Sequence, residues 1–297
     1  MSPPPGSRSV APSRTPARAD RWQLRTRVVT FGRRPLLMGI LNVTPDSFSD
    51  GGLYLDPGAA VAHGLRLAAE GADILDLGGE STRPYSSPVD AVEELRRVMP
   101  VLTELVRRTP VPISIDTSKA IVAREALAAG AEIINDVTAL TGDPKMVEVA
   151  RDGRAAVCAM HMQGTPQTMQ DSPTYHDVVE EVYCFLRQRR DALVAAGIDQ
   201  ARIALDPGIG FGKNLAHNLS LLSHVWRLHE LGCPVLVGHS RKRFIRQLLR
   251  DDRADLIAGS VGVALSLARQ GVQILRVHDV AQVRQALLLF EATGGLH

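Results

Sequence analysis

The sequence predicts an α/β fold, a single (β/α)₈ barrel of the TIM-barrel class, preceded by a disordered N-terminal tail. From Arg34 onward, eight short apolar runs rich in Ile, Val and Leu alternate with longer segments of helical periodicity. The runs do not alternate between polar and apolar residues, which is typical of strands buried on both faces of a parallel sheet. Eight such units in about 260 residues also match the usual size of this barrel. The expected strands span residues 36–41, 74–77, 111–115, 132–134, 155–160, 203–205, 234–237 and 272–277.

A doubly wound sheet of the Rossmann type is the alternative fold. It usually has six parallel strands, and its first strand leads into a glycine-rich GxGxxG turn. Here eight strands are expected, and Gly39 is followed by Ile-Leu-Asn instead of such a turn. The barrel is therefore favoured.

Helix signals occur in the segments between the strands, for example over residues 57–70, 90–107, 175–196 and 253–270. Asp56, Asp143 and Asp279 stand before possible first turns, where a carboxylate can cap free backbone N–H groups. Other helices are expected to close on a glycine in the left-handed conformation, at Gly71, Gly130, Gly197 and Gly271.

The first 20 residues differ in composition from the rest of the chain. They contain five prolines and three arginines, and they lack the apolar stretch of a secretory signal. Such a segment cannot bury enough apolar surface to fold by itself. We expect residues 1–25 to form a disordered leader and residues 26–297 to form one catalytic barrel domain.

The composition also restricts the function. The 34 Lys and Arg residues are balanced by 32 Asp and Glu residues, and a net charge of +2 argues against a nucleic-acid-binding protein. No apolar run approaches the ~18 residues of a membrane helix, so no membrane association is expected. The three cysteines lack metal-type spacing, and their sparse number fits a reducing, cytoplasmic compartment. Small anionic substrates fit this balance better than a polyanion.

Acceptor groups directly follow several expected strands. The carboxyl ends of barrel strands form one rim, and active sites lie there. Asp116, Asn135 and Asp206 end the third, fourth and sixth strands. Because ionised carboxylates only accept hydrogen bonds, these groups indicate a ligand rich in N–H donors, such as a 2-amino-4-oxo heterocycle.

Cationic groups follow the last two strands. Lys242, Arg276 and His278 lie where TIM barrels usually bind phosphate. Asn42, with Asp116, offers oxygen ligands for Mg²⁺, which prefers few protein oxygens together with phosphate oxygens. The long loops at residues 44–55 and 81–90, dense in Ser, Pro and Gly, are expected to cover the site and complete a second pocket.

These residues lie within motifs that resemble those of the dihydropteroate synthase family, a family of pterin-binding TIM barrels. The resemblance runs from about residue 36 to residue 280. Its motifs are GILNVTPDSFSDGG at 39–52, DLGGESTRP at 76–84, SIDTSK at 114–119, INDV at 134–137, MHMQGTPQTMQ at 160–170, LDPGIGFGK at 205–213, GHSRK at 238–242 and RVHD at 276–279.

The resemblance implies that the protein is a transferase of folate biosynthesis. It would condense 6-hydroxymethyl-7,8-dihydropterin diphosphate with 4-aminobenzoate, releasing pyrophosphate, and it would be a homodimer and a target of sulfonamides. The pterin ring would be bound by Asp116, Asn135, Met160, Asp206, Gly210 and Lys242. The 4-aminobenzoate would be bound by Thr82, Arg83, Pro84, Phe211 and Ser240. The diphosphate would be bound by Asn42, Arg276 and His278, with Asn42 acting through Mg²⁺, and catalysis would depend on Lys242, Arg276, His278 and Asp116.

Two other functions remain as alternatives. A pterin-binding methyltransferase that serves a corrinoid protein would share the acceptor groups but would need no diphosphate corner. A non-catalytic paralogue would bind pterin but should have lost loop or phosphate-binding residues. The presence of Thr82-Arg83-Pro84, Ser240-Arg241-Lys242 and Arg276 with His278 disfavours both.

Overall fold

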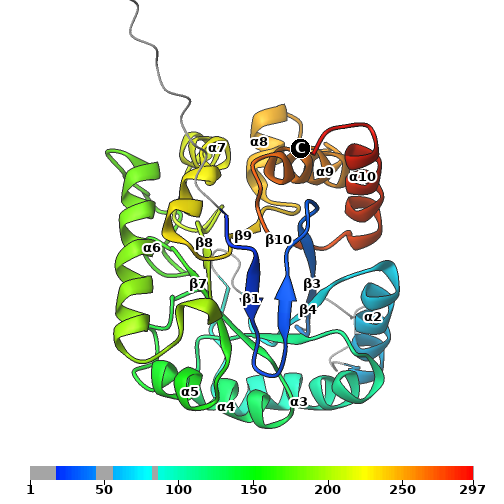
Figure 1. The fold of residues 1–297 in the computed structure, drawn as a ribbon, viewed down its shortest axis with the longest axis vertical. Coiled ribbons are helices and arrows are strands. Elements are labelled where there is room, and N and C mark those ends of the chain that lie inside the picture. The colour runs from blue at the N-terminus through cyan, green and yellow to red at the C-terminus, as the bar shows by residue number, and fades with distance from the viewer. Residues whose placement is uncertain (1–17, 45–55, 82–85, 297) are drawn as a thin grey trace, which may run out of the picture.

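Eight parallel strands, surrounded by helices, form the fold of the protein in a computed structural model (Figure 1). The structure describes residues 18–44, 56–81 and 86–296. The strands are β3 (Leu36–Asn42), β4 (Ile74–Gly78), β5 (Ile113–Asp116), β6 (Ile133–Asp136), β7 (Ala156–Met160), β8 (Ile203–Asp206), β9 (Leu236–Gly238) and β10 (Ile274–Val277). Each expected apolar run overlaps one of them, so the predicted barrel is confirmed.

The strands are hydrogen-bonded in the order β8-β7-β6-β5-β4-β3-β10-β9. A parallel bridge between Leu205 and Val235 joins β8 to β9 and brings the two edges of the sheet together. The ring of strands is therefore nearly closed, and the carboxyl ends of all eight strands lie at one end of it.

The helices around the barrel are α2 (Pro57–Glu70), α3 (Ala91–Arg108), α4 (Ala120–Ala128), α5 (Met146–Asp152), α6 (Val178–Ala195), α7 (Leu215–Ser223), α8 (Arg243–Leu249), α9 (Leu256–Arg269) and α10 (Val280–Ala292), with short 3₁₀ helices η1 (Gln200–Arg202) and η2 (Val225–Leu231). Their apolar faces and the outward-facing strand residues form the main core, in which Leu41, Leu102 and Val277 are completely buried. None of the described helices combines the length and hydrophobicity that crossing a membrane requires.

The three expected aspartate caps differ in the groups that they bind. Asp56 caps α2 as expected, accepting from the Gly58 N–H at 2.8 Å. Asp143 accepts from the Lys145 N–H, directly before α5, at 2.9 Å, and also from the N–H of Ala120, the first residue of α4, at 2.9 Å. Asp279 forms an ion pair with Arg241 and makes no side-chain cap for α10. The expected closing glycines all have positive φ, from 79° at Gly271 to 111° at Gly130.

A hairpin of β1 (Arg21–Gln23) and β2 (Val28–Thr30) closes the amino end of the barrel and lies in front of its strands in Figure 1. Trp22 and Leu24 are completely buried against an interior cluster that includes Met38, Ile74, Ile133, Ala204, Leu236 and Ile274. The Trp22 indole N–H donates to the Arg202 carbonyl at 2.9 Å. We had expected the folded part to begin at residue 26. It begins earlier, with β1, because the side chains of Trp22 and Leu24 fill the amino end of the barrel.

Candidate active site

Alternation along the strands places polar side chains in the interior, directly above the apolar cluster. Successive strand residues face opposite sides, so residues two positions beyond the cluster also point inward. At these positions the chain has Asp76, Asn135, Asp206, Gly238 and Arg276. Apolar residues thus fill the amino end of the barrel, and polar ones collect towards the carboxyl end.

Arg276 is shared between two aspartates. Its Nε donates to Asp76 Oδ2 at 2.6 Å, and its Nη2 donates to Asp116 Oδ2 at 2.7 Å. Asn135 Nδ2 also donates to Asp76 Oδ2, at 3.1 Å. Asp76 Oδ1 is buried and has no hydrogen-bond partner among the described residues. The cationic and acidic groups that were both expected at the rim therefore contact each other directly.

The environment of Asp116 changes its protonation. Burial raises its pKa to about 7, against the opposing effect of Arg276 and with the help of Asp76, whose negative charge lies nearby. One guanidinium cannot fully compensate two carboxylates removed from water. Asp116 therefore titrates in the physiological range.

Asp206, at the end of β8, and Lys242, directly before α8, are a second set of oppositely charged groups at the barrel mouth. Asp206 Oδ1 accepts from the Gly208 N–H at 2.7 Å, and burial raises the pKa of this carboxyl above its ordinary value. Lys242 Nζ donates to the Ile209 carbonyl and lies 4.3 Å from the centroid of the Phe211 ring. Burial lowers the pKa of Lys242 to about 8, although Asp206 opposes the change.

The loop after β8 approaches Lys242 closely. A Cβ at Gly210 would lie 3.0 Å from Lys242 Cδ, and Gly210 has a φ of 83°. Asn218 Oδ1 accepts from the Gly210 N–H at 2.7 Å, and Gln170 Nε2 donates to the Gly210 carbonyl at 2.8 Å. Met160, at the end of β7, is buried beside this loop. The predicted pterin residues therefore surround one region of the barrel mouth.

His278 and Ser240 contact each other beside this region. The Ser240 hydroxyl accepts from the His278 backbone N–H at 3.2 Å and lies 3.1 Å from His278 Nδ1. Through these two contacts the buried Ser240 links the segments that follow β9 and β10. The structure thus brings together a residue expected at the aminobenzoate and one expected at the diphosphate.

Asn42 ends β3 beside Asp116, across Gly78. A Cβ built on Gly78 would lie 3.4 Å from Asp116 Cβ and 3.7 Å from Asn42 Oδ1. Within residues 18–44, 56–81 and 86–296, no three His, Cys, Asp or Glu side chains gather into a metal-binding group. One amide oxygen and one nearby carboxylate fit a Mg²⁺ ion that takes most of its ligands from phosphate and water. Thr82, Arg83 and Pro84 lie outside the described residues.

Two functional candidates were missed or undervalued from the sequence. Asp76 lies in the DLGGESTRP motif and no role was predicted for it, although a carboxylate inside an apolar strand, two residues after Ile74, is itself a signal. Lys213 is almost completely buried and donates to the Phe211 carbonyl at 2.9 Å and to His161 Nδ1 at 3.0 Å. Burial lowers the pKa of Lys213 to about 7 and that of His161 to about 3. This pair fastens the loop after β8 to the end of β7.

Comparison with known proteins places the chain in one family. Residues 38–278 match the family described as pterin binding enzyme. The dihydropteroate synthase of Escherichia coli K12 is 47% identical over 259 residues, which cover 87% of this chain and 92% of the relative. A Xanthomonas albilineans dihydropteroate synthase solved with 4-aminobenzoic acid superposes with a TM-score of 0.86 at 50% identity, covering 94% of this chain and all of the other.

A second solved structure agrees with the first. Yersinia pestis dihydropteroate synthase, in complex with a sulfonamide drug, has a TM-score of 0.86 at 46% identity and covers 92% of this chain and 98% of its own. The identity, the coverage and the barrel-mouth residues lead to the same assignment. The chain belongs to the dihydropteroate synthase family of pterin-binding enzymes.

Proposed function

We propose that the protein condenses 6-hydroxymethyl-7,8-dihydropterin diphosphate with 4-aminobenzoate, forming 7,8-dihydropteroate and pyrophosphate in folate biosynthesis. The observation that carries this proposal is the gathering of Asp116, Asn135, Asp206, Lys242 and Arg276 inside one barrel mouth, in a chain of this family. This mouth offers acceptors for a donor-rich ring and cations for its leaving group.

Pterin recognition rests on the buried acceptors. Asp206 and Asp116 accept from the ring N–H and amino groups, and Asn135 supplies both an acceptor and a donor. Lys242 donates to the ring, and Met160 and Gly210 line the slot for its flat faces. These carboxylates lie in a low-dielectric site, so their hydrogen bonds to a matching ring are stronger than in water.

Departure of the diphosphate rests on positive charge. The bonds from Arg276 to the two aspartates use Nε and Nη2, and Nη1 makes no hydrogen bond to any of the described residues. Arg276 and His278 stabilise the charge that develops on the leaving oxygen. Asn42 would hold a bound Mg²⁺ ion, which would supply further neutralisation of the leaving group.

The reaction needs no nucleophilic side chain. The amine nitrogen of 4-aminobenzoate forms a bond to the pterin methylene carbon, the bond from that carbon to the diphosphate oxygen breaks, and the proton that the nitrogen loses leaves with the pyrophosphate. Phe211 and Ser240, with Thr82, Arg83 and Pro84, hold the aminobenzoate in line with the leaving group. The protein positions two reactants and excludes water.

A pyrophosphate-release assay tests this proposal. Pterin diphosphate and 4-aminobenzoate together, with Mg²⁺, should release pyrophosphate and form dihydropteroate. Chelation with EDTA should stop turnover, and added Mg²⁺ should restore it. Tight pterin binding without any turnover would identify a non-catalytic paralogue, and transfer of a methyl group to a corrinoid protein would identify the methyltransferase.

The assembly and location of the protein are part of the same proposal. A homodimer through the barrel helices agrees with two exposed leucines near the end of α8, Leu248 at 53% and Leu249 at 55% exposure. Light scattering should give twice the mass of the chain. The enzyme acts in the cytoplasm, where its three free thiols stay reduced.

A further inference from the structure

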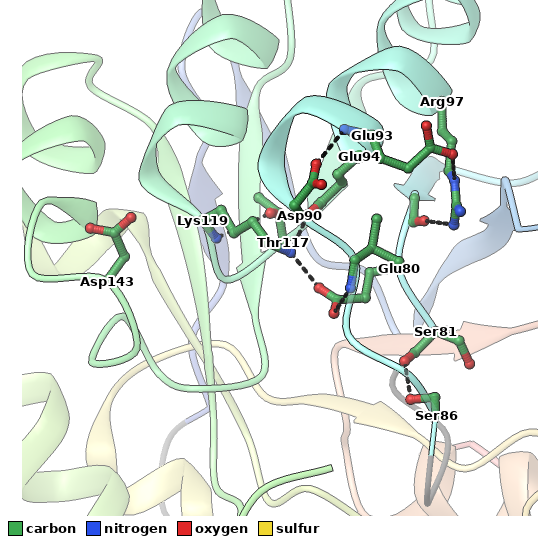
Figure 2. Close-up of polar contacts among 12 residues, drawn as sticks. Glu80, Ser81, Ser86, Asp90, Glu93, Glu94, Arg97, Thr117, Lys119 and Asp143 are labelled. Carbon is green, nitrogen blue, oxygen red and sulfur yellow. Dashed lines mark hydrogen bonds and ion pairs between the residues drawn. The ribbon is translucent and has the colours of Figure 1, made fainter. Parts of the chain in front are cut away.

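A network of three charged side chains lies beside the site, among residues to which no role has been given above. Lys119 Nζ donates to Glu80 Oε2 at 2.5 Å and to Glu94 Oε2 at 2.6 Å, as Figure 2 shows. Lys119 follows Asp116 by three residues, directly before α4. Glu80 follows β4 by two residues, and Glu94 lies in the first turn of α3. The network therefore joins the segments after β4 and β5, two strands that carry site residues, to helix α3.

The network is largely removed from solvent. The Glu94 side chain is completely buried, and its Oε1 has no hydrogen-bond partner among the described residues. The side chains of Lys119 and Glu80 are 23% and 22% exposed. Burial alone would lower the pKa of Lys119, but the contacts with Glu80 and Glu94 raise it, so the lysine remains protonated. A buried ion-pair network of this kind adds little to stability in comparison with apolar packing. Its main effect is to fix the positions of the side chains that form it.

The constraint acts on the segment after β4. Glu80 Oε1 also accepts from the Val89 N–H at 3.0 Å. Ser86 Oγ donates to the Ser81 carbonyl at 2.5 Å, and Arg97 Nη1 donates to the Gly79 carbonyl at 2.9 Å (Figure 2). The chain is thus fastened on both sides of residues 82–85, and Glu80 holds both sides at once.

We propose that Lys119 is a positioning residue for 4-aminobenzoate. By holding Glu80, it fixes the described residues 79–81 and 86–89, between which the chain carries Thr82, Arg83 and Pro84. This inference rests on the proposed function, because those three residues have their aminobenzoate role from the family resemblance. Lys119 does not contact the groups assigned to the pterin ring, so its effect should be selective for the second substrate.

Glu80→Gln is the leading test, since it weakens the attachment and leaves the buried Lys119–Glu94 pair intact. The KM for 4-aminobenzoate should rise about tenfold, which corresponds to loss of one charge-assisted hydrogen bond. The KM for pterin diphosphate, and pterin binding without aminobenzoate, should remain within about twofold of the parent values. Lys119→Arg, which can still contact both glutamates, should keep the aminobenzoate KM close to that of the parent.

The matched control is Glu104→Gln, which removes a carboxylate from an exposed ion pair with Arg107 on the same helix α3. It should leave both KM values unchanged. Lys119→Met alone would leave Glu94 charged and buried, so the double variant Lys119→Met with Glu94→Gln replaces it and should reproduce the effect of Glu80→Gln.

Three outcomes are distinguishable. If the parent protein makes no dihydropteroate, the proposed function fails. If the parent is active and Glu80→Gln matches Glu104→Gln in the aminobenzoate KM, the positioning role fails. If both KM values rise together, the network serves the fold in general, and the inference is equally overturned.

Discussion

Arg276 is a single cation that pairs with two carboxylates, those of Asp76 and Asp116. Two carboxylates and one guanidinium leave one charge uncompensated in a buried region. Asp116 is the member whose pKa responds, and it rises to about 7 through burial. Lys242, on the other side of the mouth, has a pKa lowered to about 8 by burial. The protonation of the site therefore changes within a narrow range around neutrality.

These two groups predict a bell-shaped pH profile for kcat/KM of pterin diphosphate. A raised carboxyl pKa means that Asp116 gains its charge, and its ability to accept from the ring, only as the pH rises through about 7. A lowered ammonium pKa means that Lys242 loses its proton as the pH rises through about 8. Steady-state rates measured from about pH 5.5 to about pH 9.5 cover both limbs and provide the test. Asp116→Asn should remove the acid limb, and a profile unchanged in that variant would assign this limb to another group.

Lys242 should contribute far more to activity than to stability. We expect Lys242→Met to lower kcat/KM by about 100-fold, as loss of one preorganised cation typically does. The free energy of unfolding should change by less than about 1 kcal/mol, because the lowered pKa shows that burying this ammonium is itself unfavourable. Urea denaturation and initial rates test the two parts. Lys145→Met, at an exposed position, should alter neither.

Among the secondary elements, the N-terminal hairpin should contribute strongly to stability. Trp22 fills the amino end of the barrel and is completely buried. Trp22→Ala should cost about 3–5 kcal/mol of unfolding free energy, through lost burial and the cavity left behind. Val28, on the paired strand, is 51% exposed, so Val28→Ala should cost less than about 0.5 kcal/mol. Chemical denaturation of the two variants compares them, and a small loss for Trp22→Ala would mean that the hairpin adds little to the barrel.

The loop after β8 depends on a glycine that tolerates no side chain. Gly208 has a φ of 68°, and a Cβ there would lie 1.9 Å from the His161 carbonyl oxygen. Gly208→Ala must therefore displace the Asp206–Gly208 contact, and we expect it to abolish most pterin binding and to lower the melting temperature. Gly262, in α9, has open space around its Cβ position. Gly262→Ala should raise stability by about 0.5–1 kcal/mol through helix propensity. Pterin titration and thermal melts distinguish the two variants.

The sequence predicted the strands and helices of the barrel well. Buried parallel strands appear in the sequence as continuous apolar runs, and such runs can be recognised from local composition alone. The interior position of Asp206 and Asn135 followed from the same runs. The cap at Asp279 was predicted wrongly because its carboxylate binds Arg241, a partner distant in the chain, and Asp143 binds the distant Ala120 N–H as well as the expected local N–H of Lys145. No local pattern encodes such a choice.

The hairpin and the sharing of Arg276 were missed for related reasons. Trp22 and Leu24 form an alternation too short to indicate a strand, and their burial depends on the open end of a barrel formed by residues far along the chain. The sequence indicated which charged residues reach the rim, but it could not show that Arg276 pairs with Asp76 and Asp116. The roles assigned to Thr82, Arg83 and Pro84 remain predictions.

For the molecule as a whole, one end of the barrel is filled and the other carries the site, so both substrates must enter through the same mouth. A sulfonamide that resembles 4-aminobenzoate should therefore compete with it. We expect the apparent KM for 4-aminobenzoate to rise linearly with sulfonamide concentration at constant maximal rate. Initial-rate measurements at several inhibitor concentrations test this expectation. Inhibition that excess 4-aminobenzoate cannot relieve would contradict it.

The junction between β8 and β9 is the sparsest in the barrel, with a single bridge between Leu205 and Val235. Asp206 ends the strand on one side of this seam, and Lys242 follows the strand on the other. A ring held by both side chains would span the seam and supply cross-links that the backbone does not provide there. Bound substrate would then strengthen the junction between β8 and β9, and part of the free energy of binding would stabilise the closed barrel.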